Sequence, residues 1–171
     1  MTDLKKTDVK KIESNNSARQ FLRHTLATLA YRCAKTLRDA PAGFDDFQGG
    51  SGARTPAQIL AHIGDLMDWG LSLANGEKKW NNSTPLPWDE EVKRFFAAVR
   101  KFDDYLASDA PLESPLERLF QGPVADAFTH SGQIGILRRM AGAPVKGENY
   151  FVAEIQAGRV GADQAAPKRE F

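Results

Sequence analysis

Two of the three histidines in this 171-residue chain occupy positions from which they could bind a metal ion. His130 follows Asp126 by four residues, and residues four apart stack on one helix face, with Cβ atoms about 5–6 Å apart. A carboxylate and an imidazole so placed could bind one cation, and His62 could complete the set from a facing helix. Two histidines and one carboxylate leave coordination positions for solvent or substrate, which is typical of a catalytic rather than a structural metal site.

Each of these residues also has a purely structural explanation. His62 lies in an apolar helical stripe, where its burial costs free energy unless the ring nitrogens find partners. An inward-facing carboxylate at Asp126 would need a partner for the same reason, and a metal ion, a protonated His130 or Arg138 could each supply one. The spacing alone therefore leaves metal binding and internal pairing as alternatives.

Two further polar residues lie one helical turn beyond the histidines. Asp65 follows His62 by three residues and could act beside the metal or as a general base, although a solvated helix face explains it equally well. Gln133 follows His130 by three residues, on a line next to the apolar core positions of its helix. Asp65 and Gln133 are the candidates for catalytic groups of the pocket.

The single cysteine, Cys33, excludes an intramolecular disulfide and argues against zinc or iron–sulfur sites built from thiolates of one chain. It lies among apolar residues of the first expected helix and is predicted to be a small buried hydrophobe. His24 lies off the apolar line of the same helix and is predicted to be at the surface.

Charge and hydropathy exclude some classes of partner. The formal net charge is +1, from 23 basic and 22 acidic residues, which offers no electrostatic footprint for nucleic acid or an anionic membrane. No apolar run approaches the ~18 residues of a membrane span, and the N-terminus has no apolar segment typical of an export signal. We therefore expect a cytoplasmic protein whose partner is a small molecule.

Apolar residues recur at helical spacing, and no segment alternates with period two over the length of a strand. The expected helices cover residues 17–38, 56–74, 89–106 and 123–141, with a short helical piece at 116–120. Four long helices in one domain of this size predict an all-α four-helix bundle. The expected organisation is a flexible N-terminus at 1–15, the bundle at 16–155 and a C-terminal tail at 156–171.

Two stretches of the chain resemble a known family. Residues 54–69, RTPAQILAHIGDLMDW, are similar to the second helix of the DinB-like (DinB/YfiT) metalloenzyme superfamily. Residues 125–134, ADAFTHSGQI, continuing into LRRMAG at 137–142, are similar to its fourth helix, and the resemblance covers roughly residues 17–155. It implies a bundle of up-down-down-up topology, which suits the long connection at 75–87.

The same resemblance implies a divalent metal held by His62, Asp126 and His130. Many family members have a histidine where this chain has Asp126, and a carboxylate still binds zinc, nickel, manganese or iron. Asp65 and Gln133 would lie near the open coordination positions. The resemblance also implies a homodimer.

Characterised relatives in the family include transferases and isomerases that use low-molecular-weight thiols such as bacillithiol or mycothiol. The resemblance thus implies a metal-dependent enzyme in which the metal stabilises a thiolate, or activates water for hydrolysis. A non-catalytic, dimeric helical bundle with a stress or interaction role is the alternative. An iron-dependent oxygenase is a third hypothesis, because two histidines and a carboxylate also serve that chemistry.

Overall fold

The computed structural model describes the backbone of residues 6–171 and the side chains from Asn16 onward. Its elements are α1 (Lys6–Leu37), α2 (Pro56–Ala74), α3 (Trp88–Ala107), α4 (Leu116–Leu119), the π-helical turn η1 (Phe120–Val124), α5 (Ala125–Met140) and the 3₁₀ turn η2 (Tyr150–Val152). The described residues contain no strand, and they include no helix long and apolar enough to cross a membrane. The predicted all-α fold is therefore confirmed.

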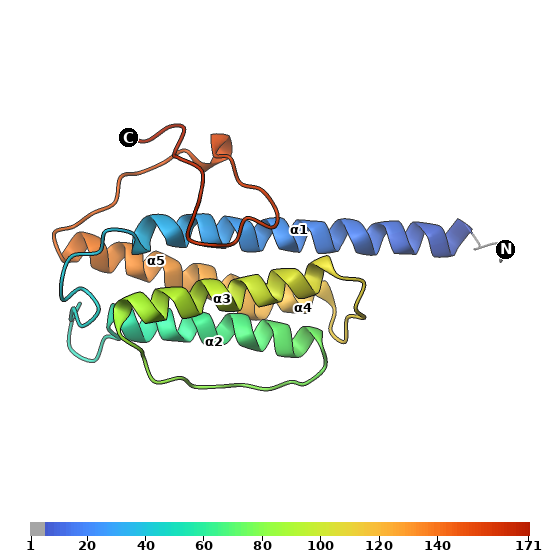
Figure 1. The fold of residues 1–171 in the computed structure, drawn as a ribbon, viewed down its shortest axis with the longest axis horizontal. Coiled ribbons are helices and arrows are strands. Elements are labelled where there is room, and N and C mark those ends of the chain that lie inside the picture. Colours follow the sequence, from blue (N-terminus) through green and yellow to red (C-terminus); the bar gives the residue numbers. More distant parts are fainter. Residues whose placement is uncertain (1–5) are drawn as a thin grey trace.

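The four long helices form a bundle in which each packs on two others (Figure 1). α2 and α1 each contact both α3 and α5, so α1 and α2 occupy opposite corners. α2 and α3 run in one direction and α1 and α5 in the other, which requires the connection between α2 and α3 to return along the bundle. The largest fully buried side chains come from all four helices and include Leu26, Leu60, Met67, Phe95, Phe102 and Ile134.

The start of α2 follows its sequence closely. Thr55 is the N-cap: its hydroxyl accepts from the backbone N–H of Gln58 at 3.3 Å, and its own N–H donates to the Gln58 side chain at 2.9 Å. Pro56 at the first helical position needs no hydrogen-bond partner for its nitrogen. Asn75 ends the helix as predicted, and Gly76 follows with a φ of 86°. This reciprocal cap fixes the residue at which α2 begins, and with it the helical turn on which His62 lies.

Two helix boundaries differ from the prediction. α1 begins at Lys6 rather than near Ser17, so the helix extends into the segment expected to be flexible; residues 1–5 lie outside the described residues. The expected break at Gly122 and Pro123 was wrong, because the chain stays helical from Leu116 to Met140. Proline has no N–H to donate, and the wider π-helical turn at 120–124 accommodates it without ending the helix.

The segment after α5, residues 141–171, which includes the C-terminal tail, packs on the bundle. Val160 is fully buried against the core, and the carboxylate of Glu148 accepts from the Tyr31 hydroxyl at 2.7 Å and from Lys35 at 2.8 Å. The tail covers α1, which lies at the corner opposite α2 (Figure 1). It therefore leaves the face between α2 and α5 uncovered.

A matched pair of glycine substitutions tests the packing of α2 against α3. A Cβ at Gly70 would lie 2.7 Å from Cε1 of the fully buried Phe102, whereas a Cβ at Gly132 on α5 would meet nothing within 4 Å. Overpacking costs about 1–3 kcal/mol and exceeds the helix propensity that alanine gains, about 1 kcal/mol. We expect Gly70→Ala to lower the free energy of unfolding in urea and Gly132→Ala to raise it by about 0.5–1 kcal/mol. Stabilisation by both would show that the α2–α3 contact is looser than described.

Candidate metal centre

The three predicted ligands converge where α2 packs on α5. Nε2 of His62 lies 3.8 Å from one carboxylate oxygen of Asp126, and Nε2 of His130 lies 3.5 Å from the other. The two imidazole rings are 4.7 Å apart between centroids and nearly perpendicular. One donor atom from each of the three residues lies within 4.8 Å of the others, and no other such group of three occurs among the described residues.

These separations fit a divalent metal ion after small movements of the side chains. Bonds of about 2.0–2.2 Å in a tetrahedral arrangement place ligand atoms about 3.4 Å apart. Nε2 of His130 and Nε2 of His62 lie 3.5 and 3.8 Å from different oxygens of Asp126, and one donor atom from each residue lies within 4.8 Å of the others. Rotation of the side chains would have to bring these atoms closer together around one ion. The two-nitrogen, one-oxygen donor set suits zinc, nickel, manganese and iron, and it leaves at least one position for solvent or substrate.

The surroundings of His62 favour its neutral form. Burial lowers the pKa of His62, and the neighbouring His130 and Arg54 lower it further, outweighing the opposite effect of Asp126. A neutral imidazole is the form that binds a metal. The lowered pKa therefore supports a ligand role over an ion pair between protonated His62 and Asp126.

Asp126 is more exposed than the sequence suggested. Its side chain is 47 % exposed, against 19 % for His62 and 15 % for His130. It lies in the first turn of α5, at the edge of the contact with α2, so the expectation of an inward, buried carboxylate was wrong. A solvated carboxylate needs no compensating charge, so the environment of Asp126 does not by itself require a metal ion. Metal binding is supported instead by the convergence of Asp126 with the two histidines.

Arg138 is not the partner of Asp126. This buried side chain donates to the carbonyl oxygens of Thr36, Arg38 and Ala143 at 2.9–3.1 Å. The last carbonyls of a helix lack partners within the helix, and Arg138 supplies donors where α1 and α5 both end. Of the three partners considered for Asp126, Arg138 is thus excluded, and a metal ion and His130 remain.

Gln133 orients one of the ligands. Its side-chain oxygen lies 2.9 Å from Nδ1 of His130, and this oxygen can only accept a hydrogen bond. The contact therefore favours the tautomer with the proton on Nδ1, in which Nε2, on the side of Asp126, is the nitrogen that can bind a metal. The structure therefore places the predicted catalytic residue Gln133 beside the site, as a residue that positions His130.

Removing this orienting contact should weaken metal binding. Loss of a hydrogen-bond partner behind a ligating histidine typically costs 10- to 100-fold in metal affinity. We expect Gln133→Ala to weaken zinc binding by roughly that factor, and Gln133→Glu, which keeps an acceptor oxygen, to restore it. Competition with a chromophoric chelator measures both affinities. Equal affinities of Gln133→Ala and the wild type would show that Gln133 does not orient His130.

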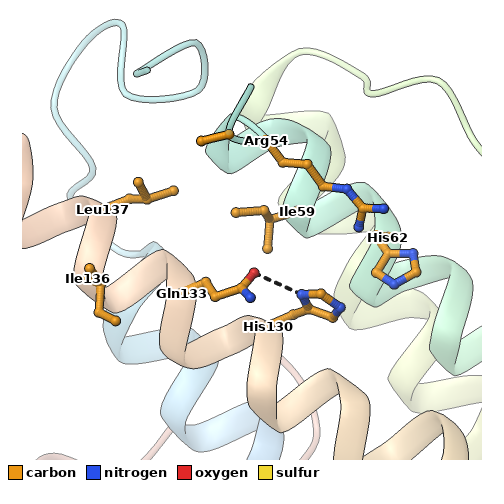
Figure 2. A pocket seen from close by; sticks show the side chains of 8 residues that line it. Arg54, Ile59, His62, His130, Gln133, Ile136 and Leu137 are labelled. Carbon is orange, nitrogen blue, oxygen red and sulfur yellow. Dashed lines mark hydrogen bonds between the residues drawn. The ribbon is translucent and has the colours of Figure 1, made fainter. Parts of the chain in front are cut away.

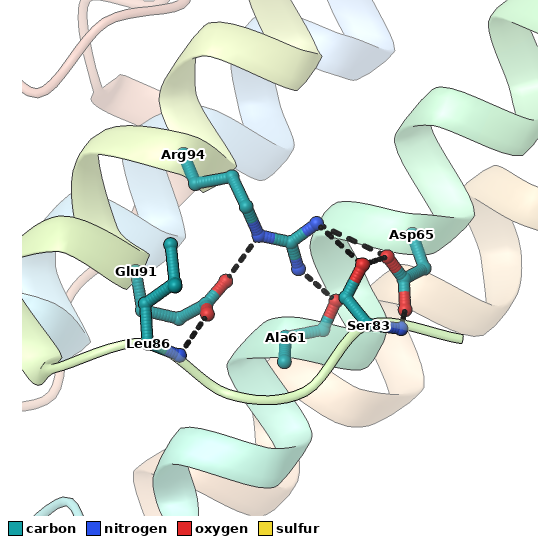
Figure 3. Close-up of polar contacts among 6 residues, drawn as sticks. All are labelled: Ala61, Asp65, Ser83, Leu86, Glu91 and Arg94. Carbon is teal, nitrogen blue, oxygen red and sulfur yellow. Dashed lines mark hydrogen bonds and ion pairs between the residues drawn. The ribbon is translucent and has the colours of Figure 1, made fainter. Parts of the chain in front are cut away.

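Asp65, the other predicted catalytic residue, is engaged elsewhere (Figure 3). Its buried carboxylate accepts from the backbone N–H and the hydroxyl of Ser83, at 2.8 and 2.6 Å, and from Arg94 at 3.0 Å. Arg94 also donates to the carbonyl of Ala61 and to the buried Glu91. With donors on both of its oxygens, Asp65 holds the 75–87 connection against α2, and the geometry offers little support for a general base.

The 75–87 connection brings an unpredicted aromatic residue to the site. The ring of Trp80 packs edge to face against the rings of His62 and Trp69, with centroid separations of 5.8 and 5.6 Å. The segment around Trp80 is polar and has no helical period, so the sequence pattern did not predict where this side chain lies. An isolated tryptophan in a polar connection was the only available signal.

Two cavities meet at His62. The first, about 550 Å³, lies between α2 and α5 and is lined by Ala53, Arg54, Ile59, His62, His130, Gln133, Ile136 and Leu137 (Figure 2). The second, about 390 Å³, is more polar and is lined by Arg54, Gln58, His62, Asp65, Asn82, Ser83, Thr84 and Pro85. Arg54, also missed in the sequence, lines both cavities.

Cys33 is buried and His24 is exposed, as predicted, and neither belongs to the group of three candidate ligands. Cys33 is fully buried, and burial raises the pKa of its thiol to about 12, so it offers no thiolate at neutral pH. His24 is exposed on α1.

No protein-family model, curated protein or solved structure matches this chain.

Proposed function

We propose that this protein is a metal-dependent enzyme that acts on a small molecule, with one divalent transition metal held by His62, Asp126 and His130. The observation that carries this proposal is the convergence of three donor atoms within 4.8 Å of one another at the wall of a 550 Å³ cavity. A cavity of this volume is in the usual range for small-molecule sites. A structural metal site would be closed by a fourth protein ligand, which the described residues do not provide here.

The family implied by the sequence resemblance is part of the proposal. We assign the chain to the DinB/YfiT type, an up-down-down-up four-helix bundle. The parallel course of α2 and α3 and the long connection between them support this topology (Figure 1). The presence of His62 on the second long helix and of Asp126 and His130 on the fourth supports it as well.

The residues around the ligands have separate roles. A bound divalent ion would supply Lewis acidity, which lowers the pKa of a coordinated thiol or water. Gln133, through its contact with Nδ1, would hold His130 in the tautomer that presents Nε2 to the metal. Trp80 covers one side of His62 and limits the access of bulk water from there. His62 and Arg54 line both cavities, which offers separate places for two reactants beside His62 and favours thiol transfer over hydrolysis.

Activity after metal exchange tests this function. Protein without an affinity tag is freed of metal by chelation and reloaded with zinc, nickel, manganese or iron. Transfer of bacillithiol or mycothiol to monochlorobimane and hydrolysis of 4-nitrophenyl acetate are then followed. We expect turnover that requires the metal and that falls to background in the His62→Ala and His130→Ala variants. Turnover that persists in chelator and in both variants would contradict a metal-dependent enzyme.

A further inference from the structure

The larger cavity beside the metal ligands has an apolar wall. Ile59 of α2 and Ile136 and Leu137 of α5 line it, and its few polar groups gather on the side of His62 and His130 (Figure 2). Ile136 is 57 % exposed although it is a large aliphatic side chain. Such a wall gains free energy by covering the apolar body of a ligand, and a few polar groups then fix the ligand's orientation.

The cavity also contains a cation that the protein itself does not neutralise. Arg54 is exposed and, like the exposed Arg100 and Arg139, forms no ion pair and no hydrogen bond among the described side chains. It is the one arginine among the residues that line this cavity. Figure 2 shows the guanidinium of Arg54 beside the ring of His62. Guanidinium groups bind carboxylates through paired, charge-assisted hydrogen bonds, and Arg54 has its donors free to do so.

We propose that this cavity binds a small organic carboxylate with an apolar body, held by Arg54 at its charged end and by Ile59, Ile136 and Leu137 along its length. This inference deepens the proposed function and rests on it, because it places the charged end of the substrate beside the metal ligands. The near-neutral surface of the protein would not attract such an anion over long range, so recognition depends on the local charge of Arg54.

A pair of ligands that share an apolar body but differ in the charge of the head group tests the inference. Octanoate and octan-1-ol share a seven-carbon body, and isothermal titration calorimetry of the full chain in chelator measures the binding of each without any metal. We expect Arg54→Ala to weaken octanoate binding roughly tenfold and to leave octanol binding unchanged. Arg139→Ala is the matched control, because it removes one exposed positive charge from α5 outside this cavity. It should alter neither ligand.

The apolar wall is tested by Ile136→Ser, a change at an exposed position that should leave the fold intact. We expect it to weaken octanoate and octanol binding to similar extents. Failure of octanoate to bind the wild type, or equal octanoate affinity in Arg54→Ala, would overturn the inference. The zinc affinity of the wild type is measured in parallel. A wild type that binds zinc but not octanoate would refute the carboxylate site alone, and a wild type that binds octanoate but not zinc would refute the metal centre.

Discussion

Replacing His130 by alanine is expected to weaken zinc binding by more than the roughly 100-fold that loss of an outer hydrogen-bond partner can cost. In the proposed centre His130 supplies one of the two imidazole nitrogens, and without it only His62 and the half-exposed Asp126 remain. Two ligands hold zinc far less tightly than three, because solvent must occupy the vacated position. Chelator competition measures the affinity, and far-ultraviolet circular dichroism checks that the helical content is unchanged.

The remaining histidine provides the matched control for this variant. His24 is exposed on α1 and lies outside the candidate site, so His24→Ala should bind zinc like the wild type. His62→Ala and Asp126→Ala should behave like His130→Ala. Full zinc occupancy in His62→Ala or Asp126→Ala, at concentrations that saturate the wild type, would show that the ligand set is wrong.

Replacing Arg94 by methionine is expected to cause the largest loss of stability. Arg94 is the shared cationic partner of Asp65 and Glu91, whose side chains are 2 % and 0 % exposed. Removal of one member of a buried ion pair costs about 3–5 kcal/mol, because the other charge stays buried without compensation. For a domain of this size, that loss lowers the thermal midpoint by roughly 6–20 °C. Differential scanning calorimetry gives the midpoint.

The same substitution at Arg100 separates this effect from the general cost of removing an arginine. Arg100 lies on the same helix, is exposed and has no carboxylate partner among the described side chains. Arg100→Met should therefore change the midpoint by a few degrees at most. Similar midpoints for Arg94→Met and Arg100→Met would show that the buried network contributes little.

The polar network around Arg94 also connects stability to the site. It fixes Ser83 and the backbone N–H of Leu86 to the helices, and the same connection carries Trp80 onto His62. Gly64 makes the arrangement possible, since a Cβ there would lie 2.8 Å from the Arg94 guanidinium. The buried cluster of Asp65, Glu91 and Arg94 thus positions the connection that carries Trp80 onto His62, a proposed metal ligand.

Local signals predicted the helices well where the cause was local. Thr55 and Pro56 mark the start of α2 through capping and proline geometry that involve neighbouring residues only. Pro123 was misleading because proline usually ends a helix, and here tertiary packing retains the helix through a π-helical turn. The packed tail could not be foreseen, because Glu148 finds Tyr31 and Lys35 more than a hundred residues away.

The candidate site, too, was predicted where helical spacing determines a residue's place and was missed where contacts with irregular or distant segments determine it. His130 and Asp126 are one helical turn apart, so their proximity follows from the helix period, and the amphipathic stripe of α2 indicated the direction of His62. The roles of Asp65 and Trp80 depend on the irregular connection after α2, whose path no period encodes. The exposure of Asp126 was missed for a related reason, since helix periodicity gives the face of a residue but not where that face meets solvent.

X-ray absorption spectroscopy at the zinc edge reports directly on the ligand set. With one equivalent of zinc bound, we predict two imidazole nitrogens at about 2.0–2.1 Å and oxygen ligands from Asp126 and solvent at about 2.0–2.2 Å. In His62→Ala, measured at a protein and zinc concentration high enough to load the weakened site, one imidazole contribution should disappear. A spectrum without imidazole scattering, or with sulfur at about 2.3 Å, would contradict a centre built from His62, Asp126 and His130.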